Sequence, residues 1–242
     1  TRHRDLIICF FLPILIMGSY FASRGMVPFG SSSLLTVDLG QQYVDFFAYL
    51  RTSLLHHPAS LLYSFSKGLG GEMWGTNAYY LLSPLNLVLL LFPHQCLTSG
   101  IMVVLLLKYG LAALSFGWLL KHEHLQTGSR LIIFTTGYAM MGWMIANQLN
   151  LLWLDVLALL PLVIAGLLKI SRQESANMYI GWLTLLIIDN YYMGWMVCLF
   201  TLPFLLWQLS RQNAPASKTV FKTYLLSSLT SVALSAVVLL PT

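Results

Sequence analysis

The hydrophobic residues of this chain form long stretches without charge, and charged residues occur mainly between them. The stretches that contain no Asp, Glu, Lys or Arg cover residues 6–23, 73–107, 109–120, 131–154, 156–168, 175–188, 190–210 and 223–242. Because a helix needs about 20 apolar residues to cross the hydrocarbon core of a membrane, this pattern predicts transmembrane helices.

Two regions must each contain a turn. At a rise of 1.5 Å per residue, a helix over 131–168 would be about 57 Å long and one over 175–210 about 54 Å long, and both lengths exceed the thickness of a bilayer. We expect the chain to reverse at the polar segments NQLN (147–150) and DNYY (189–192). The result is an all-α polytopic membrane protein with about seven spans. The predicted spans are 6–23, 101–120, 131–147, 151–168, 177–189, 192–209 and 221–240.

The first span is followed by a large loop, residues 24–100, which we place on the outer side. Residues 39–56 of this loop predict an amphipathic helix on the membrane surface, ending at the segment HHP. Its apolar face has helical spacing and consists of Tyr43, Phe46, Phe47, Leu50 and Leu54. The apolar segment 79–93 is short and contains Pro84 and Asn86, so we expect an interfacial or re-entrant helix there.

Composition supports a membrane location. The chain is 57% hydrophobic and 9% charged, whereas soluble domains have about 25% charged residues. The excess apolar surface must contact a lipid bilayer. The net charge of +5 is not concentrated in a basic run, so no nucleic-acid partner is indicated, and the three cysteines form no CxxC motif.

The basic residues predict the orientation, because cytoplasmic loops of membrane proteins are enriched in Lys and Arg. On the predicted topology nine of the thirteen basic residues lie on one side, which we take as cytoplasmic together with the N-terminus. These nine are Arg2, Arg4, Lys121, Arg130, Lys169, Arg172, Arg211, Lys218 and Lys222. We therefore expect a multi-pass protein of the bacterial cell membrane.

Acidic residues are scarce, and most of them fall at the predicted outer face. Of the eight Asp and Glu residues, this face receives Asp38, Asp45, Glu72, Asp155 and Asp189. Asp45 lies on the side of the predicted surface helix that faces water. Asp38 precedes Gln41 by three residues, which is the pattern of a helix capping box, and the same position would also suit a functional carboxylate. Acidic residues inside membranes usually line a cavity and carry function.

Lys108 is the only basic residue deep within a predicted span, since Lys222 lies at the very start of the last one. It could extend to the lipid headgroups, or its ammonium group could bind a lipid phosphate or Asp155. Asp155 has apolar neighbours in sequence, so it needs a cation, either Lys108 or an arginine of the outer loop. Asp189 and Asn190 could simply turn a hairpin.

Several motifs, taken in order, resemble the YfhO-type family of bacterial membrane proteins. They are TVDLGQQYVDFFAYLR, FSKGLGGEMWGTNAYYLLSPLNLVLLLFP, the span with an embedded lysine and DNYYMGWM, and the resemblance runs along residues 1–242. Members of this family are longer, so we expect this single transmembrane module to be the N-terminal part of a longer protein.

The resemblance implies a GT-C type glycosyltransferase. Such an enzyme moves a sugar from a polyprenyl-phosphate donor to a cell-wall polymer, such as teichoic acid, on the outer membrane face. GT-C enzymes share an acidic residue in the first outer loop, and the matching position is Asp38. Many of them have two adjacent acids there, whereas VDLG has one, so no cofactor is certain and a divalent metal remains an open alternative.

On this hypothesis Asp38 is the general base for the acceptor hydroxyl. The candidates for holding the donor are Lys108, Arg24 and Lys67 for the phosphate, Asp155, Asp189 and Asn190 for sugar hydroxyls, and Tyr191 for an aromatic contact. Two alternatives stay open, a lipid or polymer transporter or flippase that uses the same acids, and a non-catalytic scaffold for cell-wall assembly.

Overall fold

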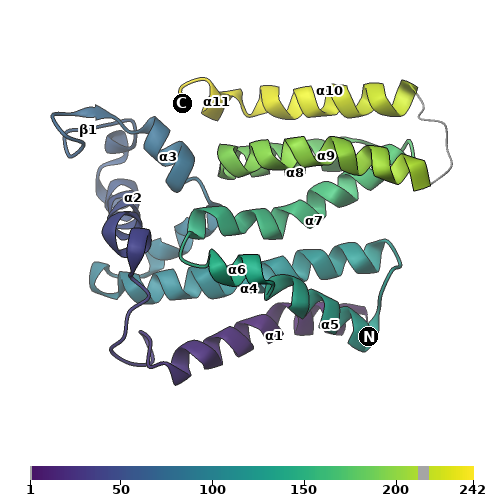
Figure 1. Ribbon diagram of the computed structural model, residues 1–242. Helices are drawn as coiled ribbons and strands as arrows, with labels where there is room; N and C mark the ends of the chain where they lie inside the picture. Colours follow the sequence, from purple (N-terminus) through teal and green to yellow (C-terminus); the bar gives the residue numbers. More distant parts are fainter. Residues whose placement is uncertain (1, 212–217) are drawn as a thin grey trace.

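The computed structural model describes residues 2–211 and 218–242, and within them it is a bundle of long helices with a layer of short elements at one end (Figure 1). The helices of the bundle are α1 (Arg2–Ser23), α4 (Leu97–His122), α5 (Gly128–Ala139), α6 (Gly142–Ala146), α7 (Leu151–Ser171), α8 (Asn177–Asp189), α9 (Tyr191–Arg211), α10 (Lys218–Leu234) and α11 (Ala236–Leu239). We call the end with the short elements the loop end, and the end where α1 begins the basic end.

The loop end is built from residues between α1 and α4. In chain order it contains a π-helical turn (Leu39–Tyr43), α2 (Val44–His56), a 3₁₀ turn (Pro58–Leu61), the hairpin β1 (Tyr63–Ser64) and β2 (Gly71–Glu72), α3 (Trp74–Tyr80), and 3₁₀ segments at Pro84–Leu91 and His94–Cys96. The predicted surface helix over 39–56 is thus present as two consecutive elements. Of its predicted apolar face, Tyr43, Phe47 and Leu50 are buried, whereas Asp45 is exposed.

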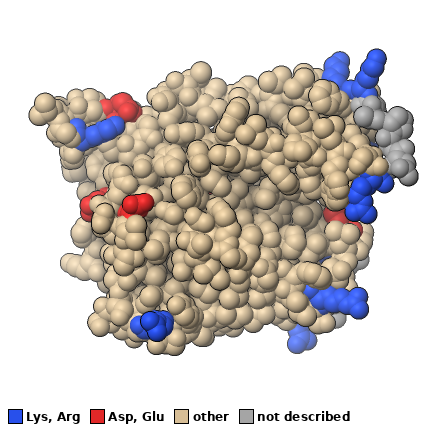
Figure 2. Space-filling model, in the orientation of Figure 1, with Lys and Arg blue, Asp and Glu red and all other residues tan. Residues whose placement is uncertain are grey.

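Four helices are long and apolar enough to cross a membrane: Arg4–Ser23, His94–His122, Leu151–Ser171 and Tyr191–Arg211. In Figure 2 the charged side chains lie near the two ends, and a broad band between them carries none. Both features fit a multi-pass membrane protein. The count of about seven spans stays a prediction, because α5, α8 and α10 have only 12, 13 and 17 residues.

The turns predicted at polar segments are confirmed. NQLN separates α6 from α7, and Asp189 ends α8 immediately before Asn190 takes an extended conformation and α9 begins. The surface helix ends at His56, and Pro58 follows it.

The segment 79–93, predicted as an interfacial or re-entrant helix, is divided into two helical elements. Helix α3 ends at Tyr80, and Ser83 is extended, with ψ of 124°, before a 3₁₀ segment begins at Pro84. The proline ring disfavours the α conformation for the residue before it, so the helix cannot continue through Ser83. The side chain of Asn86 compensates by donating a hydrogen bond from Nδ2 to the carbonyl oxygen of Leu81 at 3.1 Å.

The predicted span 131–147 is also divided. Helix α5 ends at Ala139, Met141 is extended with ψ of 154°, and α6 begins at Gly142. The chain therefore changes direction inside this apolar segment, as Figure 1 shows between α5 and α6. No charge or proline marks the position in the sequence.

Helices α4 and α7 form the centre of the bundle. Helix α4 packs against α1, α5 and α7, and α7 packs against α8, α9 and α10. Small residues allow the closest contacts, as is common between membrane helices. A Cβ atom added to Gly166 of α7 would lie 2.4 Å from the backbone nitrogen of Tyr179 in α8. The α7–α8 contact is thus a backbone-to-backbone contact that only glycine permits.

We predict that Gly166→Ala lowers the melting temperature of the protein in detergent, because the added methyl group must push α8 away from α7. Gly181→Ala is the matched control, since a Cβ atom there would meet nothing within 4 Å. The measurement is thermal unfolding of the two purified variants. Equal melting temperatures for both would contradict the close contact.

Single cysteines test the orientation. In a background without the native cysteines, Ser66→Cys in the β1–β2 turn should react with a membrane-impermeant maleimide in intact cells, because this exposed residue lies at the loop end. Ser129→Cys, exposed at the start of α5 at the basic end, should react only after the membrane is permeabilised. The reverse pattern of labelling would place the loop end in the cytoplasm.

Candidate functional site

A buried ion pair joins the two central helices. Lys108 of α4 and Asp155 of α7 form a salt bridge, and their side chains are only 1% and 7% exposed. The ammonium group also donates a hydrogen bond to the carbonyl oxygen of Leu151 at 3.0 Å. Lys108 therefore does not extend to the headgroups, and Asp155 has the cation that a carboxylate among apolar residues requires.

A second buried carboxylate lies beside this pair. Asp189, the last residue of α8, is 5% exposed and interacts electrostatically with both Asp155 and Lys108. The hydroxyl of Ser83 stabilises it electrostatically, but the two groups do not meet in a hydrogen bond of good geometry, and Asp189 Oδ1 has no hydrogen-bond donor among the described residues. Two carboxylates thus share one ammonium group. We call Lys108, Asp155, Asp189 and Ser83 the buried cluster.

Asn190 connects the buried cluster to the loop end. Its side chain is buried and donates a hydrogen bond from Nδ2 to the carbonyl oxygen of Tyr79 at 2.9 Å. Its Oδ1 accepts a hydrogen bond from the backbone N–H of Met193, also at 2.9 Å, which is the arrangement of a helix N-cap. One asparagine therefore both starts α9 and fixes α3 above the cluster.

Aromatic rings continue from α3 toward the surface helix. Tyr79 lies next to Tyr80 and Tyr191, with ring centres 4.7 and 5.8 Å apart, and Tyr80 lies 5.5 Å from Tyr43. We call these four residues the tyrosine row. Its members come from three separate parts of the chain, and it leads from the exposed start of the surface helix to the buried cluster.

Tyr43 is held as a neutral hydroxyl at this end of the row. Burial, and less strongly the nearby carboxylate of Asp38, raise the pKa of Tyr43 to about 12. Its hydroxyl donates a hydrogen bond to Asn150 Oδ1 at 3.2 Å. This contact fixes the surface helix to the NQLN turn. The sequence predicts the turn but not this contact.

Asp38 is exposed at the start of the surface helix. The capping-box prediction is wrong, because Asp38 already has helical φ and ψ of −62° and −31° and its side chain makes no capping hydrogen bond. The following residues Leu39–Tyr43 form a π-helical turn, which displaces the backbone N–H groups that a capping side chain would bind. The carboxylate faces solvent, near Tyr43 and Tyr80.

The two other candidate cations lie apart from the buried cluster. Arg24 is exposed directly after α1. Lys67 binds within the hairpin, donating to the carbonyl oxygen of Glu72 at 2.6 Å and to Glu72 Oε1 at 3.3 Å. The N–H of Gly75 and the Lys67 ammonium group lower the pKa of Glu72. This part of the large outer loop is therefore a small ordered hairpin.

Metal ligands do not converge in the described part of the chain. No three His, Cys, Asp or Glu side chains among the residues described are placed to hold one ion. Two residues of this candidate site, Ser83 and Asn150, were not indicated by the sequence. Ser83 precedes a proline and Asn150 lies in a turn, so both had a sufficient local explanation, and only the packing brings them to the site.

These features define a polytopic α-helical membrane protein with a buried charged cluster beneath an amphipathic layer. A family model, Bacterial membrane protein YfhO, matches residues 9–242, and the chain belongs to this family. Membership suggests a glycosyltransferase-like role of the GT-C type. No curated protein and no solved structure matches the chain.

We predict that breaking the buried pair costs more stability than removing both of its members. Lys108→Met leaves Asp155 and Asp189 without a cation and should cost about 3–5 kcal/mol, whereas Lys108→Met combined with Asp155→Leu should recover part of this loss, because only Asp189 then lacks its cation. The measurement is a double-mutant cycle from unfolding in detergent.

The exposed pair of the hairpin is the matched control. Lys67→Met, Glu72→Gln and their combination should leave the unfolding transition unchanged, because exposed ion pairs contribute little to stability. Additive losses for Lys108 and Asp155, with no recovery in the double variant, would show that the two charges are not coupled.

Proposed function

We propose that this protein is a glycosyltransferase that uses a polyprenyl-phosphate sugar as donor and a cell-wall polymer, such as teichoic acid, as acceptor at the outer face of the membrane. The observation that carries the proposal is that the buried charged residues of the described chain, Lys108, Asp155 and Asp189, all lie toward the loop end of the bundle. A lipid-linked donor has a tail that requires lipid and a phosphosugar that requires polar contacts. The loop end offers both within one layer.

Asp38 is the proposed general base. An exposed carboxylate at the start of the surface helix can accept a proton from the hydroxyl of a water-soluble acceptor, and no capping hydrogen bond occupies it. The attacking oxygen then forms the new glycosidic bond while the bond to the lipid phosphate breaks. The departing phosphate gains negative charge, which a nearby cation stabilises.

Arg24 is the better placed cation for that phosphate. It is exposed and lies close to the end of α1, at the depth where headgroups are found. Lys108 could bind the phosphate only by exchanging Asp155 for it, and Lys67 would have to leave the hairpin. In this proposal Lys108 therefore acts chiefly as a positioning residue that holds the side chain of Asp155 beside Asp189.

The buried cluster is the proposed polar floor of the donor site. Asp189 Oδ1 is a buried acceptor without a donor, and a sugar hydroxyl is a donor of suitable chemistry. Asn190 and Tyr191 join this floor to the tyrosine row, whose rings can stack against a sugar or the first prenyl units. A divalent metal, if one takes part, would need ligands from the substrate as well as from the described residues.

A transporter or flippase is the second candidate, because the buried carboxylate of Asp189 is also the kind of group that lines ion and proton pathways. Such a pathway requires polar groups through the whole membrane depth. Here the buried cluster lies toward one end, and on the face that Figure 2 shows the band between the ends carries no charge. A scaffold that performs no chemistry would need neither the buried cluster nor the exposed carboxylate of Asp38.

We predict that Asp38→Asn lowers sugar transfer by about 10²–10⁴-fold, because the amide cannot accept the proton of the acceptor. The assay follows a labelled sugar from a polyprenyl-phosphate donor into polymer, in membranes that contain the protein. Asp45→Asn is the matched control, since it removes an exposed carboxylate of the same helix and should retain activity. Unchanged transfer by Asp38→Asn would remove the general-base role, and absence of transfer by the unaltered protein would favour the scaffold.

A further inference from the structure

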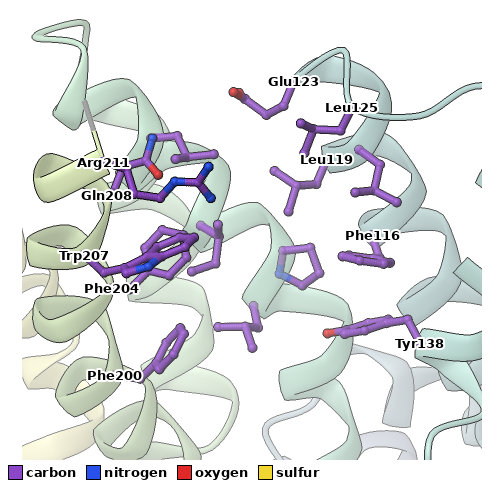
Figure 3. Close-up of a pocket in the computed structure, with 15 residues that line it drawn as sticks. Phe116, Leu119, Glu123, Leu125, Tyr138, Phe200, Phe204, Trp207, Gln208 and Arg211 are labelled. Carbon is purple, nitrogen blue, oxygen red and sulfur yellow. The ribbon is translucent and has the colours of Figure 1, made fainter. Parts of the chain in front are cut away.

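The basic end carries a pocket that the proposed function does not use. A pocket of about 460 Å³ opens there between α4, α5, α7 and α9 (Figure 3). Its deeper wall is aromatic and aliphatic, with Phe116, Tyr138, Phe200 and Phe204 among its residues. Its mouth carries Glu123 on one side and Arg211 with Gln208 on the other.

The charges at the mouth are not equivalent. Arg172 donates to both carboxylate oxygens of Glu123, at 2.7 and 3.2 Å, and to Glu174 at 2.8 Å, so Glu123 already has a bidentate cation partner. Arg211 is exposed, its guanidinium lies 5.4 Å from the ring centre of Trp207, and it makes no ion pair with any carboxylate that the structure describes. The mouth therefore presents one arginine that can take an anion.

The interior is built to stay apolar. The hydroxyl of Tyr138 is satisfied inside the protein by the carbonyl oxygen of Leu157 at 2.9 Å, and its ring stacks on Phe116 at 4.4 Å between centres. The pocket thus offers hydrocarbon contacts below and a cation above. That order matches an acyl chain and its phosphate at the membrane boundary.

We propose that this pocket binds one anionic phospholipid, with its phosphate on Arg211 and Gln208 and an acyl chain along the aromatic wall. The charge of this end favours such a lipid, because the anionic surface of the cytoplasmic leaflet attracts basic residues near the membrane. The site is separate from the loop end, and its test requires no glycosyl transfer.

Native mass spectrometry of the whole protein in mixed micelles measures the bound lipid directly. The probes are phosphatidylglycerol and phosphatidylcholine of equal chain length. The unaltered protein should retain phosphatidylglycerol preferentially, and Arg211→Gln should weaken this binding about fivefold, because one basic residue near a membrane surface contributes about that factor. Lys222→Gln, an exposed cation of α10 that does not line the pocket, should leave the binding unchanged.

A second variant tests the interior. Ile164→Trp places a larger side chain in the wall of the pocket and should reduce retention of phosphatidylglycerol even though Arg211 is intact. A circular dichroism spectrum like that of the unaltered protein shows that the variant is folded. Equal retention by the Arg211 and Lys222 variants, no preference over phosphatidylcholine, or displacement of phosphatidylglycerol by equimolar polyprenyl phosphate would overturn the proposal.

Discussion

The structure depends on a charged pair buried between its two central helices, where removing charge from water costs free energy. Transferring an ammonium group and a carboxylate out of water costs several kcal/mol each, and their attraction offsets this cost only when the geometry is good. Lys108 and Asp155 meet this condition because α4 and α7, the two central helices, place them directly against one another. The register between these helices is then fixed, since a shift of either would separate the charges. The helices that pack against α4 and α7 are positioned relative to this fixed pair.

The pair also explains why the polar groups gather at the loop end. The shared ammonium group stabilises the buried carboxylate of Asp189. Asn190, the next residue, donates a hydrogen bond to the carbonyl oxygen of Tyr79. The loop between α1 and α4 is in this way attached to the ends of α8 and α9. The tyrosine row then extends the polar layer to Asp38. A site assembled from the first loop and from the α8–α9 turn therefore rests on a single buried cation.

The sequence was sufficient for features that follow from length, charge and local chemistry. Helix length requires turns within 131–168 and 175–210, and polar residues are the only places for them, so NQLN and DNYY could be located. A lone lysine and a lone aspartate in apolar segments need each other, which made the contact of Lys108 with Asp155 a sound expectation. The break between α5 and α6 could not be found, because it results from packing and no local residue marks it. The role of Asp38 as a cap failed for a similar reason, since a capping box presupposes an α-helical first turn and this helix begins with a π-helical one.

The two ends of the bundle differ in chemistry because their charged residues are arranged differently. At the loop end the buried cation, Lys108, is already paired, so a phosphate would have to bind exposed residues such as Arg24, while the buried carboxylates favour neutral hydroxyl groups. At the basic end the acid Glu123 is paired, through Arg172, and an arginine remains at the mouth of an apolar pocket. Under the proposed function, the first arrangement favours a sugar and disfavours tight retention of a phosphate, as an enzyme that releases a lipid product requires. Under the further proposal, the second favours a retained anionic lipid, so the two ends would bind lipids for different purposes.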